Sequence, residues 1–469
     1  MKDSRYAQGM QTTQYRGWSC EVEVELQDSM RAHSANPASE SKRNDEQEYQ
    51  KWMLEKILNR DNLNQAYKKV VKNKGSHGVD GMKVEELLEY LKQNGEQIKQ
   101  RLLEGTYHPS PVRRIEIPKP DGGIRLLGIP TVLDRMIQQA IAQILTPIYE
   151  QIFSPNSYGF RPKKSAQQAI EKAQGYMKEG YRWVVDIDLE KFFDRVNHDK
   201  LMSMLSRKIK DKRVLKLIRS YLNSGVMING LEVVSEEGCP QGSPLSPLLS
   251  NVMLDDLDKE LERRNHKHCR FADDCNIYVK SKKAGERVME SITEYLNKVL
   301  KLKVNAEKSA VDRPWKRKFL GFSFYISKGE VKVRVHEKPI KKLMGKIKSA
   351  TSRSNGKNVQ QRIKELNQIV IGWVNYFGIA DMKNKLQTID EWTRRRMRMC
   401  QWKQWKKGKT RFKNLMKLGI EKPKAWEWAN TRKGYWRISN SPILNRTLTN
   451  EHFREMGLVS LTGRYSIVH

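Results

Sequence analysis

The chain has 469 residues, of which 38% are hydrophobic and 30% are charged. This length favours about three domains with a sizeable buried core, and no stretch approaches the roughly 20 uninterrupted apolar residues of a membrane-spanning helix. The 88 Lys and Arg exceed the 54 Asp and Glu, so the net charge is +34. Such an excess predicts a polyanionic partner, and nucleic acid is favoured over an anionic membrane surface because no strongly amphipathic anchor is visible.

Cysteine usage and the first residues bear on the compartment. The five cysteines are scattered, without a Cys-x-x-Cys pair or nearby paired histidines, which argues against structural zinc and against a disulfide framework. The start of the chain lacks the apolar core of a secretory signal, so a cytoplasmic protein is expected. Residues 1–46 are polar and aperiodic, which predicts a mobile extension.

Helical periodicity begins near Glu46 and returns from Leu63 after a polar break. The loop 73–81, which contains three glycines, ends this second helix. It is either a flexible turn or a segment that approaches a ligand or another backbone closely. Residues 84–103 are again predicted to be helical.

A hairpin is predicted next. The segment 112–118 alternates as a strand does, and Pro120-Asp121-Gly122-Gly123 predicts a turn into a returning strand. Lys119 and Arg125 flank the tip, where they are either solvated surface charges or cations that hold a triphosphate. Buried or capped helices are predicted at 131–153 and 165–179, with a compact aromatic loop at 158–162 between them.

Two acids interrupt an otherwise apolar strand at 183–189. Asp186 and Asp188 share one face because side chains alternate along a strand. Carboxylates in such a strand are costly unless they are paired or bind a metal. The alternative is that they lie at the exposed end of the strand and contact only water.

A second pair of acids lies between two short β-like runs at 268–279. Asp273 and Asp274 either tolerate the backbone of a tight turn or project two carboxylates towards a divalent metal. Before them, the uncharged Gly- and Pro-rich loop 238–247 is stiff and exposes Gln241, or is merely a connector into a helix at 248–264. A helix is predicted at 284–299, and strands close this region near Phe319–Phe324.

Beyond about Val335 the chain is predicted to be mostly helical and strongly basic. Apolar residues from Ile363 to Phe377 recur at helical spacing, which is typical of a helix-bundle core. The segment 392–419 contains no acid. Its cations alternate with Trp392, Trp402 and Trp405, a pattern that favours phosphate neutralisation with base stacking over a solvated helix face.

These features together predict nucleotidyl transfer. Carboxylates on a strand and on a hairpin can hold two divalent ions, with Mg²⁺ expected and Mn²⁺ as a substitute. A two-metal nuclease would use similar groups. The cations Lys119 and Arg125 favour a polymerase, because a triphosphate needs them and a nuclease does not.

The order of motifs resembles the reverse transcriptase/maturases encoded by bacterial group II introns, in the class without an endonuclease module. The resemblance covers roughly residues 50–469. It rests on Ile117–Gly123, Ser157–Pro162, Asp186–Asp194, Pro240-Gln241-Gly242, Phe271–Asp274, Asn305 with Lys308-Ser309, Leu320-Gly321-Phe322 and Gly372–Phe377. Phe271 stands where a tyrosine is commoner, and Ser243 replaces a frequent glycine.

The resemblance implies an α+β fold: a right-hand polymerase, with fingers and palm on a mixed or antiparallel sheet, followed by an α-helical thumb or maturase region. The implied divisions are an extension at 1–46, a helical extension with a template-contacting loop at 47–110, fingers and palm at 111–330, a thumb at 331–410 and a basic nucleic-acid-binding segment at 411–469.

The resemblance also implies residue roles. Asp188, rather than Asp186, joins Asp273 and Asp274 as the catalytic metal ligands, with the backbone at Ile187 assisting. The incoming dNTP would meet Lys119, Arg125, Gln241 and Lys308, and Phe193 would exclude a ribose 2′-hydroxyl. Leu320, Gly321 and Phe322 resemble the primer grip. The predicted nucleic-acid contacts are Lys74, His77, Arg161, Arg394, Arg395, Arg396, Arg398, Trp402, Lys403, Trp405, Lys406 and Lys407.

The implied function is RNA-directed DNA synthesis by a protein that binds its intron RNA and promotes splicing and retrohoming by target-primed reverse transcription. Its expected partners are the intron RNA, an RNA template with a DNA primer, a DNA target and dNTPs, with no membrane. In bacteria it would be cytoplasmic and nucleoid-associated when engaged with DNA. The alternatives are an RNA-binding maturase with little polymerase activity and a domesticated defence reverse transcriptase.

Overall fold

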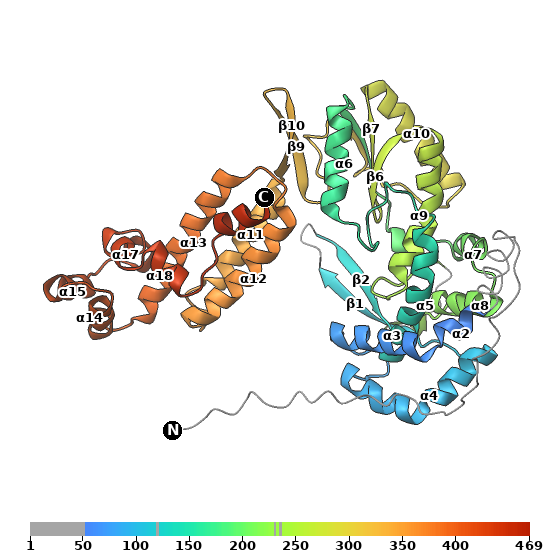
Figure 1. The fold of residues 1–469 in the computed structure, drawn as a ribbon, viewed down its shortest axis with the longest axis horizontal. Coiled ribbons are helices and arrows are strands. Elements are labelled where there is room, and N and C mark those ends of the chain that lie inside the picture. The colour runs from blue at the N-terminus through green and yellow to red at the C-terminus, as the bar shows by residue number, and fades with distance from the viewer. Residues whose placement is uncertain (1–51, 119–121, 229–230, 234–236) are drawn as a thin grey trace, which may run out of the picture.

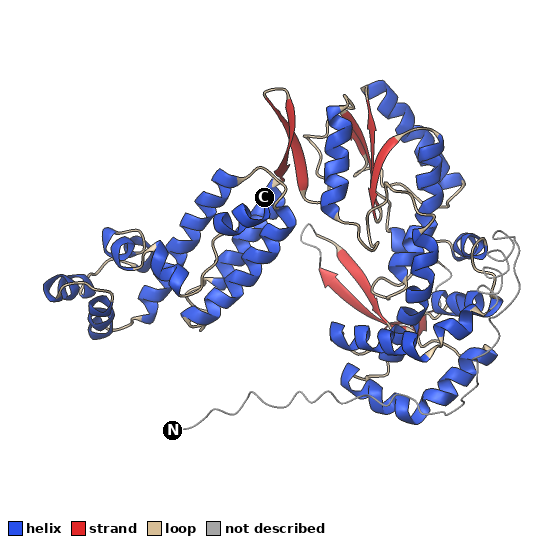
Figure 2. Cartoon of the chain, in the orientation of Figure 1, coloured by secondary structure: helices blue, strands red, loops and turns tan. Residues whose placement is uncertain are grey.

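The computed structural model describes residues 52–118, 122–228, 231–233 and 237–469. Figure 1 shows helices mixed with strands through most of the chain and helices alone at the C-terminal end, and Figure 2 shows where the strands lie. The predicted α+β class with a helical C-terminal region is therefore confirmed. Among the described helices, none is long and apolar enough to cross a bilayer.

Four helices pack into the base of the α+β part. The Asn59 side chain accepts from the Asp61 amide and starts α3, which packs along α5. The Thr131 side chain accepts from the Asp134 amide at the start of α5, and apolar residues at helical spacing bury its inner face. The helices are α2 (Met53–Ile57), α3 (Arg60–Asn73), α4 (Leu87–Glu104, after a short helix at Val84–Glu86) and α5 (Val132–Glu150).

A four-stranded sheet beside these helices has the order β2-β1-β4-β5. The predicted hairpin is its main part: β1 and β2 are antiparallel, and Pro118 lies opposite Ile124 near the tip. The short strands β4 and β5 were not predicted. The bounds are β1 (Val112–Pro118), β2 (Ile124–Ile129), β4 (Val226–Ile228) and β5 (Leu231–Val233).

A second four-stranded sheet, of order β6-β7-β3-β8, carries the acids. Its strand β3 is buried on both faces: Val184 packs in the core shared with the C-terminal helices, and Val185 packs in the core shared with α5 and α9. The strands are β3 (Trp183–Ile187), β6 (Lys267–Phe271), β7 (Asp274–Val279) and β8 (Ala310–Asp312), and the nearby helices are α6 (Ala166–Lys178), α7 (His198–Ser206), α8 (Lys212–Leu222), α9 (Ser246–Arg263) and α10 (Lys282–Lys298).

An antiparallel hairpin leads into the helical end (Figure 1). The predicted division at residue 331 falls inside its second strand, and the division at 410 falls inside α14. The hairpin is β9 (Phe322–Ser327) and β10 (Glu330–Val335), followed by α11 (Glu337–Ala350), α12 (Val359–Phe377), α13 (Lys383–Gln404), α14 (Gly408–Lys417), α15 (Lys422–Ala429), α16 (Tyr435–Ile438), α17 (Pro442–Thr447), α18 (Asn450–Glu455) and α19 (Leu461–Val468).

Candidate active site and nucleic-acid interface

The predicted acids meet at one end of the second sheet. Strands β6 and β7 pair from Phe271 opposite Asp274, so Ala272 and Asp273 form a two-residue turn. Strand β3 runs antiparallel to β7 and its last pair is Ile187 with Cys275. Asp188 follows directly and lies in the same cleft as Asp273 and Asp274. The strand prediction and the hairpin prediction therefore describe two parts of one site.

This cleft has a volume of about 1320 Å³ and is lined by several of the predicted functional residues. Ile187 is buried in the core, whereas the next residues, Asp188 and Leu189, line the cleft. A metal-binding role for the backbone at Ile187 stays a prediction. Besides the three acids, the lining includes Arg125, Phe193, Gln241 and Lys308.

Asp186 has a different environment from Asp188. The Arg317 guanidinium donates to the Asp186 carboxylate, with Nε and Nη2 at 2.9 and 2.7 Å. Burial raises the pKa of Asp186, and the hydrogen bond from Arg317 opposes that rise. Among the described residues, no ion pair engages the side chains of Asp188, Asp273 or Asp274. The charge of Asp186 is thus balanced by Arg317, whereas the carboxylates of the other three acids remain available to bind a cation.

Burial and neighbouring charges raise the pKa of two of these acids, Asp273 and Asp274. Burial, followed by the charges of Asp273, Asp186 and Asp188, raises the pKa of Asp274 to about 7. Burial likewise raises the pKa of Asp273, with the Asp188 charge adding to it and Arg125 opposing it. Uncompensated carboxylates of this kind fit a hard divalent cation.

The arrangement is not a closed metal cage. Within the described ranges, no group of three or more His, Cys, Asp or Glu side chains is arranged so that it could hold a metal ion by itself. Mg²⁺ is commonly bound through one or two carboxylates, with waters and substrate phosphates completing its shell. The residues present therefore fit a divalent ion that is completed by its substrate.

Asp274→Asn is expected to stabilise the metal-free protein above pH 7. The folded protein holds the pKa of this carboxyl near 7, against 3.8 ordinarily, so stability falls as the pH rises through that window. Because the side chain reaches solvent, we expect a gain of about 1 kcal/mol after screening, which raises the melting temperature by roughly 2 °C at pH 8. Melting curves in chelator at pH 4 and pH 8 measure this, and a variant no more stable than wild type at pH 8 would contradict it.

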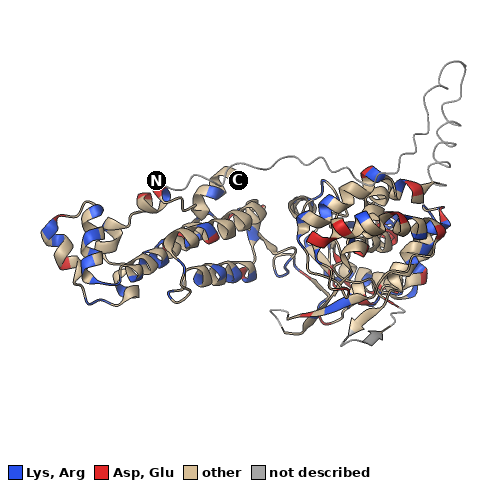
Figure 3. Ribbon diagram, turned by 90° about the horizontal axis from the view of Figure 1, so that it is seen from below, with Lys and Arg blue, Asp and Glu red and all other residues tan. Residues whose placement is uncertain are grey.

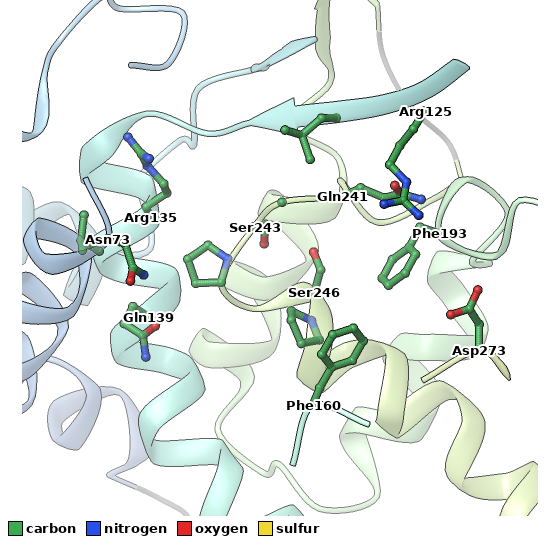
Figure 4. Close-up of a pocket in the computed structure, with 15 residues that line it drawn as sticks. Asn73, Arg125, Arg135, Gln139, Phe160, Phe193, Gln241, Ser243, Ser246 and Asp273 are labelled. Carbon is green, nitrogen blue, oxygen red and sulfur yellow. The ribbon is translucent and has the colours of Figure 1, made fainter. Parts of the chain in front are cut away.

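The groups predicted to bind a nucleotide come from separate elements. Figure 4 shows Arg125 beside Gln241 and near the Phe193 ring, with Asp273 on the adjacent hairpin. The backbone fixes this wall, because the Gly128 amide donates to the Gln241 carbonyl at 2.8 Å and the Cys239 amide donates to the Phe193 carbonyl at 2.6 Å. Lys119 lies outside the described residues.

The two departures from the family pattern have different packing environments. Ser243 is buried, and its hydroxyl accepts from the Leu245 amide just before α9. Phe271 packs partly buried against the core shared with the C-terminal helices.

The predicted primer grip lies next to the same acids. Leu320 and Gly321 line a second cleft of about 580 Å³ that also contains Asp188 and Asp274. The Tyr376 hydroxyl on α12 donates to the Leu320 carbonyl at 3.1 Å. Phe322 is buried, and its ring stacks on the Tyr376 ring with a distance of 5.8 Å between the centroids. The C-terminal helices therefore help to hold this turn.

The glycine loop 73–81 is anchored to the α+β part. The Arg113 guanidinium donates to the His77 carbonyl, with Nη2 at 2.8 Å, and Arg135 donates to the Ser76 carbonyl at 2.7 Å. Gly78 lies so close to Thr131 that a Cβ would sit 2.6 Å from its Cα. The close-contact interpretation is therefore favoured over a flexible turn, and Lys74 is exposed beside it.

Arg161 does not match its predicted contact with nucleic acid. Its side chain is buried, and its guanidinium donates to Glu150 with Nε–Oε1 and Nη2–Oε2 distances of 3.0 Å. Nη1 donates to the carbonyls of Ser154 and Ser157. Arg161 therefore holds its own loop, because every side of the guanidinium faces a protein acceptor.

The basic C-terminal segment is only partly a surface. Trp402 is 1% and Trp405 8% exposed, so the predicted stacking of bases on these rings is wrong: the rings belong to the core. The hydrogen bonds also use several cations structurally. Arg396 donates to Thr351, Arg398 to the Leu448 carbonyl and Lys403 to the Arg353 carbonyl, whereas Arg394 is half-buried and Lys406 and Lys407 are exposed.

Two other indoles were missed by sequence reasoning. Trp426 is 63% and Trp436 40% exposed, and the Arg395 guanidinium lies 3.9 Å from the Trp436 ring centroid. Figure 3 shows Lys and Arg along the C-terminal helices with few acids among them. Exposed rings in a surface rich in cations suit single-stranded nucleic acid. The sequence signal that could have identified Trp426 and Trp436 is their position in a basic stretch.

Comparison with known proteins agrees with this geometry. Residues 117–324 match the family described as reverse transcriptase (RNA-dependent DNA polymerase), and residues 340–419 match the group II intron, maturase-specific domain. Protein YkfC of Escherichia coli (strain K12) is 34% identical over 289 residues, which cover 53% of this chain and 76% of YkfC.

Two further matches cover less. The group II intron-encoded protein LtrA of Lactococcus lactis subsp. cremoris is 38% identical over 195 residues, covering 41% of this chain and 32% of LtrA. The chain thus spans about a third of LtrA. A chain of a solved structure titled partial Cas6-RT-Cas1–Cas2 complex is 29% identical, covers 52% of this chain and 42% of that chain, and has a TM-score of 0.35.

The fold and the cleft define the class as an α+β polymerase palm followed by a helical region. Within this class, the chain belongs to the family of reverse transcriptase/maturases encoded by group II introns.

Proposed function

We propose that this protein is an RNA-directed DNA polymerase that also binds its group II intron RNA and promotes its splicing and retrohoming. The observation that carries the proposal is the cleft in which Asp188, Asp273 and Asp274 stand without an ion-pair partner among the described residues, beside Arg125 and Lys308. The three carboxylates call for bound metal cations, and the two basic side chains call for an anionic substrate.

Asp188, Asp273 and Asp274 would hold two Mg²⁺ ions, for which Mn²⁺ can substitute. When bound, such ions activate the primer 3′-hydroxyl and stabilise the leaving pyrophosphate. The carboxylates must lose their protons for this, so the raised pKa of Asp274 makes ion binding stronger as the pH rises through about 7.

The surrounding residues bind and orient the dNTP. Arg125 neutralises the triphosphate on the hairpin side, and Lys308 does so near the departing pyrophosphate. The Phe193 ring fills the space beside the sugar, and Gln241 lines the pocket next to it. This division of labour follows from positioning and charge neutralisation, on which nucleotidyl transfer depends.

The helical end is proposed to bind the intron RNA, and the DNA target during target-primed reverse transcription. The exposed cations Lys406 and Lys407 would neutralise phosphates. A maturase with little polymerase activity is the second candidate. The three unpaired acids support the polymerase, because partly buried carboxylates without a partner are costly and would not be expected to persist in a site that had lost its activity.

The proposal is tested by extension of a DNA primer on an RNA template with four dNTPs and Mg²⁺. We expect full-length cDNA from the purified chain. An absence of extension under conditions in which the chain binds the primer–template would overturn the polymerase proposal while leaving the maturase candidate standing.

Replacing Trp426 and Trp436 together by alanine is expected to weaken binding of single-stranded RNA by about tenfold or more, because each stacked base contributes roughly 1–3 kcal/mol. Fluorescence anisotropy with a labelled oligonucleotide measures the change. Trp52→Ala is the matched control, since its indole is also exposed, at 49%, but lies at the N-terminal helices. Equal affinity of the double variant and wild type would contradict the assignment.

A further inference from the structure

Arg270 on β6 is a fully buried arginine next to the turn that carries Asp273. Its exposed fraction is 0%, as is that of its ion-pair partner Asp258. All five N–H groups of a guanidinium can donate, and here each has an acceptor. Nε and Nη2 donate to Asp258 at 2.7 and 2.6 Å, Nη2 also to the Ser157 hydroxyl at 2.8 Å, and Nη1 to the Asn251 side-chain oxygen at 3.0 Å and the Ala272 carbonyl at 2.8 Å.

The contact with Ala272 reaches the catalytic turn itself. The Ala272 carbonyl belongs to the peptide bond that joins Ala272 to Asp273, and a peptide unit is planar. Fixing this oxygen therefore fixes the plane from which Asp273 continues. Ala272 also has a φ of 58°, a left-handed conformation that is costly for a residue with a Cβ and must be held by its surroundings.

The other side of the turn is closed by the loop before α6. Gly159 approaches so closely that a Cβ there would lie 2.2 Å from the Ala272 amide nitrogen. The Asn251 amide donates to the Gly159 carbonyl at 2.9 Å, and Asn251 also accepts from Arg270. One side chain thus ties the loop and the arginine together, which leaves the turn little room to move.

The network is anchored on a helix that also begins at the nucleotide pocket. Asn251 and Asp258 lie seven residues apart on α9, so they share one face of the helix. This helix starts a few residues after Gln241. A buried ion pair often stabilises no more than apolar packing would. The five oriented donors of Arg270 are therefore better explained by a role in orienting the turn than by a contribution to the stability of the fold.

We propose that Arg270 is a positioning residue that sets the Ala272–Asp273 peptide plane, and thereby the Asp273 carboxylate, for divalent-ion binding. This inference rests on the proposed polymerase function. It requires the planar, five-donor guanidinium and not only a positive charge.

The test variant is Arg270→Lys, which keeps the charge but loses the fork of donors. Mn²⁺ binding is measured by electron paramagnetic resonance on a complex with an RNA template, a dideoxy-terminated primer and the next dNTP, so that no turnover is needed. We expect the Mn²⁺ dissociation constant to rise about tenfold or more, with primer–template affinity within about twofold of wild type. Hydrogen exchange at residues 271–275 should also become faster.

Arg362→Lys is the matched control. Arg362 is also buried, and its guanidinium donates to the carbonyls of Lys357, Ala350 and Ser352 far from the turn. Both variants are expected to lower the melting temperature, but only Arg270→Lys should weaken Mn²⁺ binding. Equal Mn²⁺ affinity in Arg270→Lys and wild type would overturn the positioning role.

If Arg270→Lys does not fold, Asn251→Ala replaces it, because this change frees one Nη1 donor and the Gly159 carbonyl. A rise in the Mn²⁺ dissociation constant of about threefold or more supports the inference, and an unchanged value overturns it. A failure of the proposed function would be recognised by a different result: wild-type protein would bind the primer–template but not extend the primer.

Discussion

Replacing Asp273 and Asp274 together by alanine is expected to lower the rate of RNA-templated primer extension by at least about 10³-fold. The two carboxylates line the cleft with Asp188, and their loss removes the charges that would hold divalent ions at the reacting atoms. Single-turnover incorporation of one nucleotide measures the rate without interference from product release. Binding of the intron RNA should stay near the wild-type value, because the exposed basic helices are untouched.

Asp199→Asn provides the control for removing a carboxylate. Asp199 pairs with Arg219 on the surface, and its side chain is 84% exposed. Its loss should leave the incorporation rate unchanged within about twofold. If the Asp273 and Asp274 double variant extended primers as fast as Asp199→Asn, the assignment of the catalytic hairpin would be wrong.

Phe193→Ala is expected to admit ribonucleotides. The ring lines the cleft beside Arg125 and Gln241 (Figure 4), and a clash with the 2′-hydroxyl is a repulsive element that rejects the wrong sugar. Removing it should reduce the preference for dNTP over rNTP by about 10²-fold, mainly through faster rNTP incorporation. The measurement is the ratio of kcat/KM for matched dNTP and rNTP substrates on the same RNA template.

Phe160→Ala is the informative control for this ratio. Phe160 lines the adjoining pocket with Phe193, so its loss can change nucleotide affinity. It should nevertheless leave the sugar preference unchanged. A similar drop in sugar preference for both variants would mean that Phe193 does not act as a specific barrier.

Local patterns were sufficient to predict the site-bearing elements. The alternation at 183–189 and the paired acids at 268–279 gave the correct strand and hairpin, since both signals come from neighbouring residues. That Asp188 and Asp274 share a cleft depends on the pairing of β3 with β7. Neither segment by itself shows this distant pairing. The expectation that the strand and hairpin acids form one metal site came from carboxylate chemistry, and the family resemblance then selected Asp188 over Asp186.

Burial at the C-terminal end could not be predicted in the same way. Composition marked 392–419 as a run of cations and indoles, but it does not say which side of α13 packs inward. Trp402 and Trp405 are core residues, whereas the exposed rings of Trp426 and Trp436 lie outside that run. The roles of Arg161 and Arg270 were missed as well. Arg161 is held by acceptors of its own loop and of the end of α5, which a residue pattern does not reveal. Arg270 donates to Ser157, which is distant in the sequence.

The pairing of Asp188 with the hairpin acids is tested most directly by comparing Asp188→Asn with Asp186→Asn in single-turnover incorporation on an RNA template. We predict that Asp188→Asn slows incorporation by about 10³-fold. Asp186→Asn, whose side chain can still accept from Arg317, should stay within about tenfold of wild type. The reverse order, with Asp186→Asn inactive and Asp188→Asn active, would contradict this account of the site.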